Sequence, residues 1–288
     1  MLRKGGNMLD GFVLSHRLVL FQPNDQTRIR DFVLESPVRA LYFETLDPIN
    51  EVLFRTFRDA YLQSIGVELH MAEVLKKYIG GLTPIERLVL EIVLLHRLNC
   101  FYISRERELG QQDPLVHRAL VITGAMLQDR LTLLLLDVHG DEYDRIYNLG
   151  RQNGQMSRDS WDVNFLGACA VVRVVRGLNA NERTKSIFLS NPLDDADFGI
   201  DLFVSREDRD LAISVKSHKT PDLMSATIFP FQPLQQGHEQ QIFNGAVLAK
   251  DYYGIHFIPV LAVVGRNGTQ PFDLELHRED VEALGRVL

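Results

Sequence analysis

Two charged residues on neighbouring predicted strands are the strongest chemical signal in this sequence. Asp201 lies in the apolar run from Phe198 to Val204, and Lys216 lies in the run from Leu211 to Ser217. A short polar link joins the two runs, so they are predicted to form a β-hairpin. Lys216 shares its strand face with Ser214, and Asp201 can face the same side from the other strand. Charges are costly to bury unless they are paired or bind an ion, so this pair indicates a site.

The hairpin resembles the core hairpin of the PD-(D/E)XK nucleases. The resemblance lies in Gly199-Ile-Asp201-Leu-Phe-Val, the polar turn and Ile213-Ser-Val-Lys216-Ser, and Asp197-Phe-Gly-Ile-Asp201-Leu is similar to a run in Mrr-like restriction enzymes. It extends over about Ser157 to Val264. The resemblance implies a restriction-endonuclease-like fold in which Asp201 binds Mg²⁺ or Mn²⁺. Such a metal polarises a phosphodiester and activates a water, while Lys216 orients that water or neutralises charge.

One position departs from the family pattern. The residue two before Lys216 is Glu, Asp or Gln in the family, but here it is Ser214. A hydroxyl is a poor substitute, because hard divalent cations prefer carboxylate oxygens. Either the site is inactive or the second acid comes from elsewhere. A subgroup of type II restriction enzymes has Ser-x-Lys here and takes its Glu from the following helix, which implies Glu239 as a catalytic metal ligand. Asp197 is a further candidate ligand.

Glu239 is the acid best placed for this role in the predicted helix from Pro233 to Asp251. It stands three residues before Ile242 and seven before Ala246, on the face expected to pack onto the sheet. The structural alternative is a carboxylate that favours the positive end of the helix dipole. The connection from Lys216 to this helix is also longer than in the restriction-enzyme subgroup.

Four basic residues are candidates for contacts with nucleic-acid phosphates. His218 and Lys219 follow Lys216 closely, and Arg173 and Arg176 lie near the end of a preceding helix. For the two arginines, the simpler interpretation is a solvated surface.

The second half of the sequence predicts an α/β (α+β) domain, with a mixed sheet flanked by helices. Its first helix is expected over Ser157 to Gly177, and an acidic loop, residues 191–197, is expected before the hairpin. The other expected elements are a strand from Lys185 to Ser190, a Pro-rich loop after the hairpin, the helix from Pro233, a strand from His256 to Val264 and a short C-terminal helix.

The first half is predicted to be mostly helical. Helices are expected to start at Asp47-Pro48, at Thr83-Pro84 (to about Leu98) and at Asp113-Pro114 (to near Asp137), since a capping residue followed by Pro favours a helix start. Extended segments are expected at Gly11–Leu20 and Val38–Phe43. The polar stretch Asn148–Arg158 favours a boundary, which gives a helical domain over residues 1–150 and a nuclease-like domain over 151–288.

The composition is that of an ordinary globular protein. Apolar residues make up 45% and charged residues 24% of the 288 residues, and the net charge is −7, which argues against a basic nucleic-acid-binding surface. Two cysteines, Cys100 and Cys169, indicate buried thiols in a reducing cytoplasm. The longest apolar stretch is broken by Gln128-Asp129-Arg130, so we expect no membrane span, and no signal peptide is recognised.

Two classes of function follow from the sequence. The first is a metal-dependent DNA endonuclease with a restriction or defence role, whose helical half aids DNA binding or homodimer formation. The second is a non-catalytic nucleic-acid-binding or regulatory protein built on a decayed nuclease fold. In the second class, Asp201 and Lys216 are simply a structural ion pair.

Overall fold

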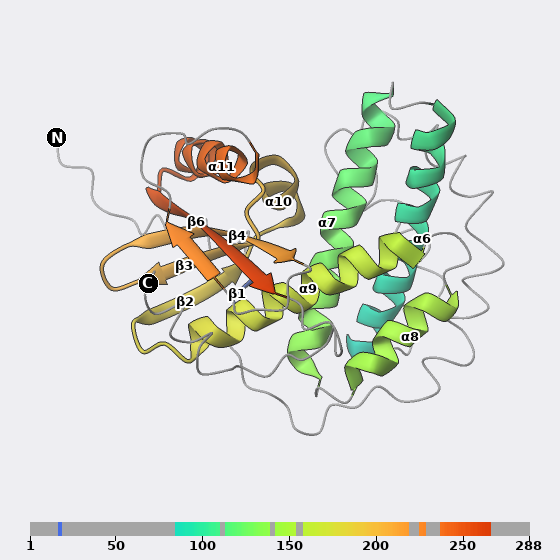
Figure 1. The fold of residues 1–288 in the computed structure, drawn as a ribbon, viewed down its shortest axis with the longest axis horizontal. Helices are drawn as coiled ribbons and strands as arrows, with labels where there is room; N and C mark the ends of the chain where they lie inside the picture. The colour runs from blue at the N-terminus through green and yellow to red at the C-terminus, as the bar shows by residue number, and fades with distance from the viewer. Residues whose placement is uncertain are drawn as a thin grey trace. The chain divides into compact units, whose positions relative to one another are not determined.

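The computed structural model describes residues 17–18, 84–109, 113–138, 142–153, 158–218, 225–228 and 237–265 (Figure 1). By the distribution of its contacts, the chain divides into a helical unit, Pro23–Ala168, and an α/β unit made of Met1–Gln22 and Cys169–Leu288. Helix α9 (Arg158–Asn179) runs through this division, which therefore falls later than the expected boundary near residue 150. The fold class is α/β (α+β), as the sequence predicts.

Three further helices belong to the helical unit: α6 (Pro84–Leu109), α7 (Pro114–Asp137) and α8 (Tyr143–Asn153). The start of α7 is as predicted, because the Asp113 carboxylate accepts a hydrogen bond from the Leu115 N–H at 2.9 Å. Two expectations were wrong. Helix α6 continues past Leu98, and much of the polar stretch expected at the boundary is the amphipathic helix α8.

Helix α7 is long and apolar enough, by length and composition, to cross a membrane. In the most apolar 18-residue window of α7, 56% is buried inside the structure. The core helix of a soluble protein is often equally long and apolar, so length and composition alone are weak evidence for a membrane span. The charged residues that interrupt this helix form contacts inside the unit, since Arg130 Nε lies 2.8 Å from Glu91 Oε2.

The α/β unit is built on a six-stranded mixed sheet with the order β1-β2-β3-β4-β6-β5. Strand β4 runs parallel to β6, and the other neighbours are antiparallel. The predicted hairpin is confirmed, because β3 pairs antiparallel with β4. The strands are β1 (Arg17–Leu18), β2 (Thr184–Leu189), β3 (Leu202–Arg206), β4 (Asp210–His218), β5 (Ser225–Ile228) and β6 (Phe257–Gly265).

The segment between β2 and β3 corrects two expectations. The acidic stretch is not a loop but the short helix α10 (Pro192–Phe198), and β3 begins only at Leu202. Asn191 caps α10, because its side-chain oxygen accepts from the Asp194 N–H at 3.0 Å. Pro192 then fits the first helical position, and acidic residues in the first turn favour the positive end of the helix dipole.

Helix α11 (His238–Tyr253) covers one face of the sheet, and α9 lies along the other (Figure 1). Helix α11 begins at His238, later than the predicted start at Pro233. Strand β5 lies inside the segment expected to be a Pro-rich loop. The extended segment from Val38, the helix from Asp47 and the short C-terminal helix lie outside the described residues; β1 falls within the extended segment expected at Gly11–Leu20.

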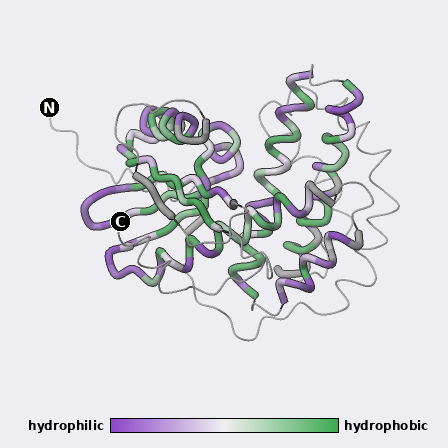
Figure 2. The backbone as a smooth tube through the Cα atoms, in the orientation of Figure 1, coloured by the Kyte–Doolittle hydropathy of each residue, from purple (hydrophilic) through white to green (hydrophobic). Residues whose placement is uncertain are grey.

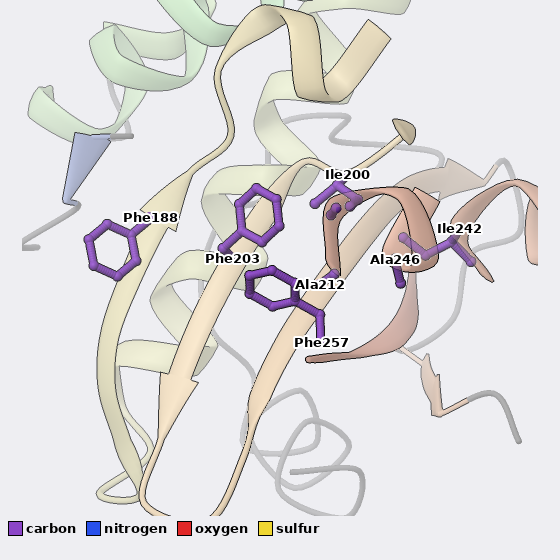
Figure 3. Packing of buried hydrophobic residues seen from close by; sticks show 8 residues of the cluster. Phe188, Ile200, Phe203, Ala212, Ile242, Ala246 and Phe257 are labelled. Carbon is purple, nitrogen blue, oxygen red and sulfur yellow. The ribbon is translucent and has the colours of Figure 1, made fainter. Parts of the chain in front are cut away.

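Aromatic and small apolar side chains fill the space between α11 and the sheet (Figure 3). Phe203 and Phe257 pack with ring centroids 4.8 Å apart, and Tyr253 of α11 meets Phe203 edge-on. Figure 2 shows that the central strands of the sheet are apolar and that the ends of the hairpins are polar. The buried cluster comprises Phe188, Ile200, Phe203, Ala212, Ile242, Ala246, Ala249 and Phe257.

Candidate functional site

The hairpin register places Asp201 beside the segment that contains Ser214 and Lys216. Leu202 pairs with Ile213, and the Asp201 N–H donates to the Ile213 carbonyl at 2.9 Å. The Asp201 side chain then accepts a hydrogen bond from the Val215 N–H, with an Oδ2–N distance of 2.7 Å. Val215 is the residue between Ser214 and Lys216, so the carboxylate is seated at the centre of the Ser-Val-Lys run.

This contact forms where the β3–β4 ladder ends. Alternate N–H groups of a strand point to the same neighbour, so the Val215 N–H faces β3 as the Ile213 N–H does. Strand β3 starts at Leu202 and offers no further ladder partner. The carboxylate of Asp201 takes the place of the missing backbone carbonyl. Asp201 therefore has a structural role whatever else it does.

Ser214 and Lys216 belong to the face of the sheet that α11 covers, and Asp201 lies beside them. Side chains alternate between faces along a strand, which groups Ser214 and Lys216 with Ala212 on β4. Phe203 and Ala212 both pack in the cluster beneath α11 (Figure 3). Asp201 and Ser214 are buried, with 7% and 2% of their surface exposed, whereas Lys216 is half-buried. Because Asp201 precedes β3, the register does not include it, and the prediction that Asp201 and Lys216 share a face stays a prediction.

Helix α11 carries Glu239 in its first turn, above this face. Glu239 precedes the buried Ile242 by three residues and Ala246 by seven, so its position falls on the helical stripe that contacts the sheet. The Glu239 side chain lies outside the described part of the structure, so its role as the second acid stays a prediction.

Asp197 lies on the last turn of α10, where its side chain is exposed. The neighbouring acid that is buried is Asp194, which the sequence did not single out. The Asp194 Oδ2 atom accepts hydrogen bonds from the Tyr253 hydroxyl at 2.6 Å and from the Asn191 side chain at 3.1 Å. Burial, followed by the hydrogen bond to Asp194, raises the pKa of Tyr253 well above its usual range. These groups tie α10 to the end of α11.

The four candidate phosphate-binding residues do not share one environment. Arg173 is buried on α9 and donates to the Gly265 carbonyl at 3.5 Å, which does not support a role in a DNA contact. Arg176 is half-buried, and its Nε atom is enclosed. His218 ends β4, but its side chain and the whole of Lys219 lie outside the described residues.

Within the described ranges, no group of three or more His, Cys, Asp or Glu side chains is close enough to hold a metal ion. The Asp201 carboxylate is still a suitable ligand for a metal ion. A carboxylate can bind a metal through one oxygen while a hydrogen bond to its second oxygen orients it. A complete site would need the Glu239 carboxylate or another donor from outside these ranges.

Comparison with known proteins identifies no relative of this chain. No protein-family model, curated protein or solved structure matches it.

Two glycines lie where α11 meets the end of α10 and the residue after it, a packing role that was not predicted from the sequence. Gly199 has a φ of +65°, a left-handed conformation that favours glycine, and Gly245 lies in the interior of α11. A glycine inside a helix is itself a signal of close packing, because it weakens the helix relative to alanine.

Proposed function

We propose that this chain is a metal-dependent nuclease that hydrolyses phosphodiester bonds in DNA. Asp201 and Glu239 are the proposed ligands of Mg²⁺ or Mn²⁺, and Lys216 is the proposed cationic group beside them. The observation that supports this most is the 2.7 Å hydrogen bond that seats the buried Asp201 carboxylate at the Ser214–Lys216 segment. When bound, the metal would supply a polarised phosphodiester and an activated water.

The protein's own groups have distinct tasks in this proposal. The Val215 N–H donates to Asp201 Oδ2 and so orients the carboxylate. Lys216 is half-buried, and its ammonium can donate to a non-bridging phosphate oxygen or to the attacking water. Ser214 is too short and neutral to replace an acid, so the proposal requires Glu239.

The test is cleavage by the purified full-length chain. Supercoiled plasmid, single-stranded DNA and RNA are incubated with Mg²⁺, Mn²⁺ or a chelator. We expect metal-dependent cleavage of DNA that Asp201→Asn and Lys216→Met each reduce about 100-fold or more. Asn keeps an oxygen for the Val215 N–H, so Asp201→Asn removes the charge with little effect on the fold.

Matched controls lie on the exposed side of α11. Asp251→Asn and Lys250→Met make the same chemical changes at exposed positions and should leave cleavage unchanged. A wild-type chain that neither cleaves any of the substrates nor binds Mn²⁺ would contradict the proposal. Equal loss of cleavage in the controls would show that the effect is not specific to the site.

The second candidate is a non-catalytic nucleic-acid-binding or regulatory protein on a decayed nuclease fold. The observation that favours it is Ser214, a buried hydroxyl where the resemblance implies an acid. This alternative predicts metal-independent binding of DNA or RNA, measured by fluorescence anisotropy, that Asp201→Asn does not change.

A further inference from the structure

Helix α11 rests directly on the backbone at the end of α10. A Cβ atom added to Gly245 would lie 2.0 Å from the Phe198 carbonyl oxygen and 2.8 Å from its carbonyl carbon. Real Cβ contacts are essentially never shorter than 3.0 Å, and a backbone carbonyl cannot rotate away as a flexible side chain can. Only glycine allows this approach of the two segments.

Further contacts with α11 follow Phe198 along the segment that leads to Asp201. Gly199 lies against the Gln241 side chain, whose nearest atom would be 2.9 Å from an added Cβ. Ile200 and Ile242 then meet in the same buried cluster (Figure 3). The next residue after Ile200 is Asp201, and the preceding turn of α11 carries Glu239.

The far end of α11 is attached to α10 as well. The Tyr253 hydroxyl donates to the buried Asp194 carboxylate at 2.6 Å, and the C-terminal residue of the helix is followed by Gly254 in a left-handed cap. Helix α11 is therefore fixed at two places by the segment that leads into Asp201.

We propose that Gly245 is a positioning residue for the metal site, because it sets how closely the first turn of α11 approaches Asp201. This inference rests on the proposed function. A methyl group at position 245 requires an outward shift of about 1 Å, from 2.0 Å to at least 3.0 Å. Mg²⁺ demands near-ideal octahedral geometry with bonds of about 2.1 Å, so a shift of that size separates two ligands that share one ion.

The experiment compares Gly245→Ala with Gly150→Ala in the full-length chain. At Gly150, in α8, an added Cβ would lie 1.9 Å from the Trp161 ring, so this control introduces a similar overlap in the helical unit. Cleavage is measured as a function of Mg²⁺ concentration, Mn²⁺ affinity is measured by calorimetry, and the melting temperature is recorded for each variant.

We expect Gly245→Ala to raise the Mg²⁺ concentration for half-maximal cleavage, and the Kd for Mn²⁺, about tenfold or more. Gly150→Ala should lower the melting temperature without changing either metal response. If Gly245→Ala proves too unstable to purify, Tyr253→Phe removes only the hydroxyl at the other attachment and should give a smaller shift, of about threefold.

The outcomes separate this inference from the proposed function. A metal-responsive wild type whose metal titration is unchanged by Gly245→Ala, or changed equally by Gly150→Ala, overturns the positioning role alone. If Gly245→Ala cannot be purified, a metal titration that is unchanged in Tyr253→Phe also overturns the positioning role. A wild-type chain that neither cleaves nor binds Mn²⁺ overturns the proposed function and the positioning role together.

Discussion

The Asp201 carboxylate closes a break in the sheet as well as facing the candidate site. Its bond to the Val215 N–H satisfies a buried donor that the end of β3 leaves without a ladder partner. Residues that combine a structural hydrogen bond with a chemical role are difficult to assign from activity loss alone. Stability and activity must therefore be measured on the same variants.

Asp201→Ala should destabilise the fold by about 1–3 kcal/mol, because it leaves the Val215 N–H buried without an acceptor. Asp201→Asn should cost clearly less, since the amide oxygen can still accept that hydrogen bond. Urea unfolding followed by circular dichroism measures both. Equal stability of the two variants would show that this hydrogen bond contributes little to folding.

Glu239→Ala should abolish cleavage as fully as Asp201→Ala or Lys216→Ala if Glu239 is the second acid. Ser214→Glu, introduced into the Glu239→Ala variant, should partly restore metal-dependent cleavage, because it returns a carboxylate to the strand. Plasmid-nicking assays with Mg²⁺ and Mn²⁺ check both. Cleavage that persists in Glu239→Ala would direct attention to Asp197.

For single residues, the sequence indicates candidate site residues better than it predicts their hydrogen-bond partners. Period-two alternation was enough to put Lys216 and Ser214 on one face. The bond from Val215 to Asp201 was not predictable, because it depends on the residue at which β3 starts, and the apolar run before Leu202 hides that start.

The elements differ from expectation where short polar segments are structured by their caps. The acidic stretch before β3 looked like a loop because it lacks an apolar period, yet Asn191 and Pro192 together start a helix there. Strand β5 was missed because its four residues, followed closely by Pro230 and Pro233, give too short a pattern to recognise. The long elements α7, α9, β4 and β6 were predicted because their periodic runs are long.

The attachment of α11 to α10 predicts a pH effect on stability. The folded pKa of Tyr253 lies above the ordinary tyrosine value of about 10, so the neutral hydroxyl stabilises the fold. That contribution is complete below about pH 10 and is lost as the pH rises beyond it. The difference in unfolding free energy between wild type and Tyr253→Phe should therefore be constant up to about pH 10 and shrink between about pH 10 and pH 11.

Denaturant unfolding at each pH measures this difference, and the other tyrosines cancel because both proteins contain them. A difference that stays constant up to pH 11 would mean that the raised pKa of Tyr253 is not coupled to folding.

The whole molecule has two units that share one continuous helix, α9. Trp161, the single tryptophan of the chain, is buried in the helical unit at the start of this helix. Because α9 continues into the α/β unit, we expect fluorescence of Trp161 and far-ultraviolet circular dichroism to report one coincident thermal transition. Two transitions separated by several degrees would show that the units unfold independently.

The pairing of β1 with β2 has a consequence for synthesis on the ribosome. Arg17 pairs with Leu189, so the first strand of the sheet leaves the ribosome 172 residues before its partner. At synthesis rates of about 5–20 residues per second, it waits between about 9 and 34 s. The helical unit is made entirely within that interval, and the sheet closes at its β1 edge only after translation has passed the helical half.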